Sequence, residues 1–208
     1  EVELMRLSQQ YLQRHPTGTW TTPVSFKIAF LLYQKGNFPE AEKWLEPIAK
    51  NPKEIELKEK SEDLLLDIYN SRKEYQRIRN FAFSILGKSK EADLGSNRGK
   101  KLTRIMEEAD LADVQESTQK LPPREAAEKF FNFVERNANS PLAKEALWKS
   151  VSLSYSAERM IEGTERALLF VQKYPEDARK TDALKEAAKT YLDTGKLLTA
   201  AELFERLA

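Results

Sequence analysis

Apolar residues near the C-terminus follow the 3.6-residue period of an α-helix in two consecutive stretches. The first stretch places them at i, i+3, i+4, i+7 and i+8, at Leu184, Ala187, Ala188, Tyr191 and Leu192. Gly195 ends this stretch, and a second amphipathic stretch begins at Leu197 and runs to Leu207. Because so short a connection makes the two helices antiparallel neighbours, the pattern predicts a helical hairpin.

The same pattern divides most of the chain into hairpins. Residues 22–86 and residues 140–208 each predict two, the earliest with Thr22 as N-cap and Pro23 at the first helical position. Residues 1–16 predict one helix that ends before Pro16. Similar closing phrases, FVERNANSP and FVQKYPEDA, end hairpins at residues 133–141 and 170–178. We therefore expect residues 1–16 to be the second helix of a truncated hairpin, and the chain to be an excerpt of a longer solenoid.

The middle of the chain departs from this regularity. Residues 87–99 are polar, contain three glycines and have no apolar period, so they predict a flexible loop. Residues 100–139 predict a degenerate hairpin, which Pro122 and Pro123 interrupt. The run from Gly95 to Lys101 lacks the spacing and the preceding strand of a phosphate-binding loop, so a surface loop is the better interpretation.

The hairpins resemble tetratricopeptide (TPR) repeats. Small residues stand where the two helices of a repeat cross, at Ala188 and Ala200, and a proline follows the second helix at Pro175. Trp148, Ser152 and Tyr155 match the spacing of the large, small and aromatic positions of the family, with Ser152 as the crossing residue. The resemblance implies an all-α fold, an α-solenoid of antiparallel helical hairpins that winds as a right-handed superhelix, over residues 1–208 as a single solenoid segment.

Composition narrows the classes of function. The 34 Lys and Arg residues are interspersed with 33 Asp and Glu residues and give a net charge of +1, which argues against a nucleic-acid partner. The chain has one histidine and no cysteine, and its titratable residues form no convergent set, so we expect no catalytic residues, no metal site and no cofactor. No apolar run reaches the 18 residues of a membrane span, so we expect no direct membrane insertion by this segment.

The resemblance also suggests a role. Closing phrases that end in His-Pro or Tyr-Pro are similar to those of extracytoplasmic bacterial TPR proteins of outer-membrane assembly and of cell division linked to Tol and Pal. Two hypotheses follow. The first is a non-catalytic protein-protein interaction scaffold of the bacterial cell envelope, in the periplasm, although a cytoplasmic location stays open. The alternative is the helical, non-catalytic part of a larger enzyme such as a soluble lytic transglycosylase.

Family geometry predicts where a protein or peptide partner would bind. The first helix of each hairpin lines the concave face, at three positions before, one after and four after the crossing residue. With Ala29 and Leu66 as crossing residues, these positions are Phe26, Phe30 and Tyr33, then Asp63, Asp67 and Asn70. An aromatic set beside an acidic set predicts a partner segment with an apolar anchor flanked by basic charge. The alternative is that Phe26 and Phe30 pack against neighbouring helices.

Overall fold

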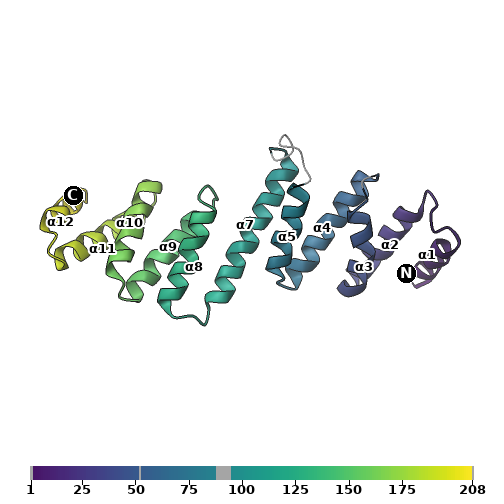
Figure 1. The fold of residues 1–208 in the computed structure, drawn as a ribbon, viewed down its shortest axis with the longest axis horizontal. Helices are drawn as coiled ribbons and strands as arrows, with labels where there is room; N and C mark the ends of the chain where they lie inside the picture. Colours follow the sequence, from purple (N-terminus) through teal and green to yellow (C-terminus); the bar gives the residue numbers. More distant parts are fainter. Residues whose placement is uncertain (1, 52, 88–94, 208) are drawn as a thin grey trace. The chain divides into compact units, whose positions relative to one another are not determined.

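Every regular element of the described chain is an α-helix. The computed structural model describes residues 2–51, 53–87 and 95–207, and within these ranges it contains eleven helices and no strand. Successive helices run up and down as antiparallel hairpins (Figure 1). This confirms the prediction of an all-α fold built from helical hairpins. The chain divides into two compact units, Glu1–Ser84 and Ile85–Ala208.

The first unit contains one single helix and two hairpins. Its helices are α1 (Val2–Arg14), α2 (Thr21–Gln34), α3 (Phe38–Ala49), α4 (Ile55–Ser71) and α5 (Tyr75–Leu86), the last crossing the boundary between units. Helices α1 to α4 each pack against the next one, and α2 also contacts α4 directly. Tyr69 of α4 meets Phe81 of α5 edge to face, with ring centroids 5.8 Å apart. The first helices of the two hairpins therefore lie side by side, which places residues of α2 next to residues of α4.

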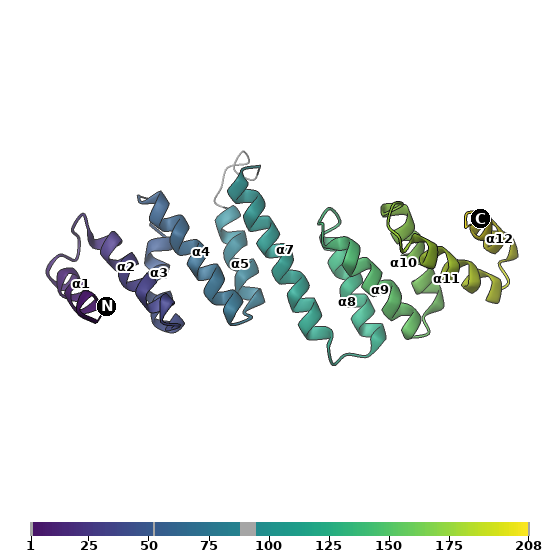
Figure 2. The same cartoon turned by 180° about the vertical axis from the view of Figure 1, so that it is seen from behind.

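The second unit contains three hairpins. Its helices are α7 (Asn97–Thr118), α8 (Pro123–Arg136), α9 (Ala143–Ser156), α10 (Met160–Lys173), α11 (Lys180–Asp193) and α12 (Leu197–Glu205). Each of these packs against the next along the chain, as the view from behind also shows (Figure 2). One continuous hydrophobic core runs through the unit, and the rings of Phe133 and Phe170 are fully buried in it.

Buried residues occupy equivalent positions in successive hairpins, 37 residues apart. In the first unit, buried Ala29 of α2 corresponds to buried Leu66 of α4. In the second unit the crossing residues of the three hairpins are also buried 37 residues apart, at Val114, Val151 and Ala188. The second helices of the three hairpins, α8, α10 and α12, repeat in the same way. Ala126, Gly163 and Ala200 are buried at equivalent positions, each 37 residues after the one before. The least regular hairpin of the sequence is therefore in register with the two that follow it.

The register corrects one sequence-based assignment. Ser152 was expected at the helix crossing, but its side chain is exposed and its hydroxyl donates to the Trp148 carbonyl 3.1 Å away. The buried residue is its neighbour Val151. Residue type is misleading here, because Tyr155 and Tyr191 stand 36 residues apart, one residue short of the 37-residue repeat. Tyr155 instead packs on Gly163, where an added Cβ would lie 3.0 Å from the tyrosine ring.

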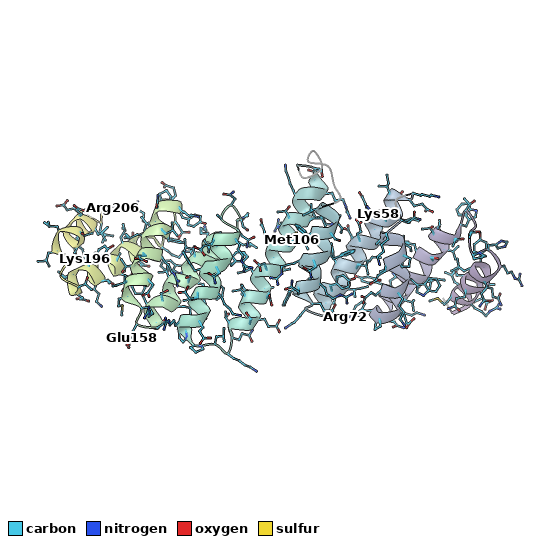
Figure 3. All side chains as sticks on the ribbon, in the orientation of Figure 1. Lys58, Arg72, Met106, Glu158, Lys196 and Arg206 are labelled. Carbon is cyan, nitrogen blue, oxygen red and sulfur yellow. The ribbon has the colours of Figure 1, made fainter. Side chains whose placement is uncertain are left out.

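Four of the five hairpin turns in the described residues contain one residue at positive φ, whether or not that residue is glycine. Gly36 and Gly195 have positive φ angles of 71° and 77°, in the region that glycine adopts without steric cost. Lys73 and Glu158, which lie 37 residues after Gly36 and 37 residues before Gly195, have φ angles of 57° and 58°. Glu158 marks the turn between α9 and α10 in Figure 3. A glycine-free turn such as SRKEY is therefore built in the same way as a turn with glycine.

Two helix boundaries differ from those predicted, and a further helix contains an internal proline. Helix α2 begins at Thr21, so Trp20 occupies the N-cap position expected of Thr22, and it makes no side-chain capping bond. Helix α3 continues through Pro47 and ends two residues later at Ala49. Helix α7 begins at Asn97, inside the range 87–99 predicted as a loop, and Ser96 caps it by accepting a hydrogen bond from the Gly99 amide at 3.0 Å. Residues 88–94 of that predicted loop lie outside the described residues.

Candidate functional site

The expected binding positions lie on two adjacent helices of the first unit. Phe26, Phe30 and Tyr33 are spaced i, i+4 and i+7 along α2, which puts them on one face. Ile28, on the other side of that helix, and Ala29, next to the aromatic positions, are fully buried. Burial of these two residues fixes the rotation of α2, so the aromatic side chains project along one edge of the hairpin core. We call Phe26, Phe30 and Tyr33 the aromatic row.

The aromatic row is a continuous stacked series. The Phe26 and Phe30 rings are 6.3 Å apart between centroids and are inclined by 16°, and the Phe30 and Tyr33 rings are 6.4 Å apart and inclined by 22°. All three side chains are half-buried, whereas core phenylalanines such as Phe133 are fully buried. The row therefore packs within the unit and also presents ring surface to solvent.

Helix α4 supplies the polar half of the site. Asp63, Asp67 and Asn70 share one face of this helix at the same spacing as the aromatic row, because each lies 37 residues after its counterpart on α2. Asp67 and Asn70 are exposed and Asp63 is half-buried. We call these three residues the polar row. Leu65, on the opposite side of α4, and Leu66, next to the polar row, are buried and hold the helix in this rotation.

A direct hydrogen bond joins the two rows. The Tyr33 hydroxyl donates to Asp67 Oδ2 over 2.5 Å. This bond to the carboxylate raises the pKa of the Tyr33 hydroxyl above its usual value, and partial burial adds to the rise. Tyr33 therefore stays protonated at neutral pH and holds Asp67 beside the ring, so the end of the aromatic row and the middle of the polar row form one surface.

Lys27 is a site residue that the family geometry did not include. Its Nζ lies 5.9 Å from the centroid of the Phe30 ring, which is within the range of a cation-π contact. The face of the aromatic row therefore already attracts a cation. The signal was available in the sequence, because Lys27 and Phe30 are three residues apart on a helix and such pairs are neighbours.

The described residues contain neither a metal-binding cluster nor a membrane-spanning helix. Among them, no group of three or more His, Asp or Glu side chains is arranged to hold a metal ion. Within the same ranges, no helix is both long enough and apolar enough to cross a bilayer. What the two rows offer instead is an open surface with aromatic faces and carboxylates, which suits contact with another macromolecule.

Comparison with known proteins finds similarity only among solved structures. No protein-family model matches the chain, and no curated protein matches it. A Podosopora anserina kinesin light chain with nearly identical TPR-like repeats is 17% identical, with a TM-score of 0.34 over 92% of this chain and 95% of that chain. YrrB, a TPR protein described as having an unusual peptide-binding site, is 14% identical, with a TM-score of 0.33 over 96% of this chain and 90% of that chain.

Proposed function

We propose that this chain is a non-catalytic protein-protein interaction scaffold whose aromatic and polar rows bind a partner segment that carries an apolar residue next to basic residues. The observation that carries this proposal is the Tyr33–Asp67 hydrogen bond, because it makes one surface of the two rows. An apolar side chain would cover the exposed ring faces of the aromatic row. A cation beside it would meet the carboxylates of α4.

The chemistry of the surface favours a peptide-like partner over a small substrate. Small-molecule sites are concave, and they bury most of the ligand. The two rows instead form a strip along the adjacent helices α2 and α4, where an extended or helical segment can contact successive positions of both. Most of the binding free energy would come from the half-buried rings, because aromatic side chains that are already packed lose little conformational freedom on binding.

The location in the cell is a separate part of the proposal. We place the scaffold in the bacterial cell envelope on the closing phrases alone, which are similar to those of extracytoplasmic TPR proteins. Fractionation of cells that express the full gene tests this placement. Recovery of the protein in the periplasmic or membrane-associated fraction would support it, and recovery in the cytoplasm would contradict the location without affecting the binding surface.

Peptide selection tests the binding surface. Peptides selected from a random library on the intact chain should carry an apolar residue adjacent to Lys or Arg. Replacement of both Phe30 and Tyr33 by Ala should reduce the binding free energy of a selected peptide by about 2 kcal/mol or more, the loss typical of buried aromatic anchors. Isothermal titration calorimetry measures the change.

Phe83 provides the matched control. It is an aromatic residue of α5 that is 64% exposed and lies outside both rows, so Phe83→Ala should leave peptide affinity unchanged. Unchanged affinity in the double variant, with native helix content by circular dichroism, would reject the site. Loss of the fold in the double variant would show that the aromatic row serves packing and would equally count against the proposal.

A further inference from the structure

We propose that the cation recognised at this surface is an arginine side chain, held between the carboxylate of Asp67 and the ring faces of Tyr33 and Phe30. This inference rests on the proposed function and specifies its partner chemistry. The proposed function requires only that the partner carry a basic residue. The arrangement around Asp67 further favours a planar, forked cation.

Asp67 is both oriented and available. Tyr33 holds Oδ2, and among the described residues nothing else hydrogen-bonds the Asp67 side chain. The carboxylate is exposed, so a ligand can reach Oδ1 without displacing another residue. A carboxylate whose rotation is already restricted loses less conformational freedom when it binds a cation.

The neighbouring groups extend this carboxylate into a surface patch that can contact one side chain. Asn70 follows Asp67 by three residues on α4, so the two side chains are neighbours on the helix surface. Asn70 is exposed, and its amide oxygen can accept a hydrogen bond from the same ligand. Tyr33, which hydrogen-bonds the same carboxylate, provides an aromatic wall.

The aromatic wall itself binds cations. Lys27 Nζ lies 5.9 Å above the Phe30 ring, near the outer limit of a cation-π contact. Lys27 is exposed, and its chain is flexible, so an incoming guanidinium can replace it over that ring. The position of Lys27 thus indicates where the charge of a partner would lie.

Arginine fits these features better than lysine does. Its guanidinium is flat and can stack on the Tyr33 and Phe30 rings, which are inclined by only 22° to each other. The same group carries several N–H donors in one plane, so it can hydrogen-bond Asp67 and Asn70 while it is stacked. A lysine ammonium is a compact, strongly hydrated charge that can satisfy the carboxylate or the ring face but gains little from both at once.

Three blocked peptides test the inference by nuclear magnetic resonance on the isotope-labelled intact chain. The probes are acetyl-Gly-Arg-Leu-Arg-Gly-amide and its counterparts with lysine or citrulline in place of arginine. The arginine peptide should shift the amide signals around Tyr33, Asp67 and Asn70 and bind about tenfold tighter than the lysine peptide. The citrulline peptide, which keeps the shape of arginine without its charge, should bind most weakly.

Substitutions at Asp67, Tyr33 and Lys27 test which side chains cause the preference for the arginine peptide over the lysine peptide. Asp67→Asn should remove the tenfold preference for arginine, and Tyr33→Phe, which keeps the ring but frees Asp67, should reduce it. Lys27→Ala should tighten arginine binding, because it removes a competing cation. As a matched control, Lys43→Ala removes an exposed lysine from α3 and should change nothing.

The outcomes separate this inference from the proposed function. Equal affinity for the lysine and arginine peptides, with shifts at both rows, would overturn the arginine inference and leave the binding surface standing. Shifts elsewhere on the chain, or no binding by any of the three peptides at millimolar concentration, would overturn both.

Discussion

Four hairpin turns place a residue in the left-handed region of backbone conformation, and two of these residues are not glycine. Lys73 and Glu158 carry the steric cost of a Cβ at positive φ, whereas Gly36 and Gly195 do not. By residue type alone, a turn without glycine looks different from a turn with glycine. The residue types concealed the equivalence, and only the 37-residue register could have revealed it.

Substitutions to and from glycine at these four positions test whether the turns have the same backbone conformation. Lys73→Gly and Glu158→Gly should each raise the free energy of unfolding by a few tenths to about 1 kcal/mol, because relief of backbone strain exceeds the added entropy of the unfolded chain. Gly36→Ala and Gly195→Ala should each lower it by about 1 kcal/mol. No atom lies within 4 Å of a Cβ added at either glycine, so the loss would come from the backbone alone. Urea unfolding measures all four variants, and a loss on replacing Lys73 or Glu158 by Gly would contradict the account.

Spacing along the sequence predicts which helix faces carry the two rows, but it does not predict the contact between them. Spacing from Ala29 and Leu66 predicted the face on which Tyr33 and Asp67 lie, and the structure places them within hydrogen-bonding distance. The bond depends on the side-chain rotamers of two residues 34 positions apart, and periodicity carries no information on rotamers. Ser152 was misplaced for a related reason, since similarity of residue type was given more weight than regular spacing.

Neighbouring hairpins of the second unit are linked by polar contacts at equivalent positions. Ser140 precedes α9 and donates to Glu107 of α7 over 2.7 Å, and 37 residues later Asp177 precedes α11 and pairs with Lys144 of α9 at 3.1 Å. Arg179 adds a bidentate contact to Glu145, at 2.7 and 2.8 Å, and stacks against the Trp148 ring. The segments that precede α9 and α11 are therefore bonded to the first helix of the preceding hairpin, α7 and α9 respectively.

The Arg179 contacts predict a dependence of stability on pH. Hydrogen bonds from Arg179 lower the pKa of the Asp177 carboxyl well below its ordinary value of 3.8, and they lower the pKa of Glu145 as well. Since the folded state holds these protons less tightly than the unfolded state does, the stabilisation is complete above the ordinary values and is lost as pH falls below them. Arg179→Gln should thus destabilise the chain at pH 7, and the difference from the native chain should shrink below about pH 4.

Arg104 supplies the control for this pH dependence. It pairs with Glu108 at 2.8 Å on the exposed side of α7, and exposed pairs on a helix contribute at most about 0.5 kcal/mol. Arg104→Gln should therefore have little effect at either pH. Thermal unfolding between pH 7 and pH 3 measures both variants, and a deficit of the Arg179 variant that stays constant over this range would contradict the predicted linkage.

Helix boundaries were predictable where apolar residues reach the ends of an element. The first turn of α7 contains Asn97, Arg98 and Gly99, and no apolar side chain is buried before Leu102, so periodicity placed these residues in a loop. The capping serine at position 96 was the available signal. Helix α7 has 22 residues and α9 has 14, so the irregular hairpin differs by an extended first helix rather than by loss of the repeat.

At the scale of the whole molecule, the hairpin architecture followed from the sequence because each apolar period is long and regular. The division at residue 84 did not, since it falls inside the regular helix α5 and depends on how densely each side packs within itself. The right-handed superhelix stays a prediction. The proposed function depends only on α2 and α4, which belong to one unit and contact each other directly.

Site-specific crosslinking in living cells tests the proposed function most directly. A photoreactive phenylalanine analogue in place of Asn70, at the exposed end of the polar row, should crosslink a partner through a segment that contains an apolar residue next to Arg or Lys. The same analogue in place of Lys43, an exposed position of α3, should give no such product. Mass spectrometry of the crosslinked peptides identifies the segment. Equal crosslinking from both positions, or partner segments without a basic residue beside an apolar one, would contradict the account.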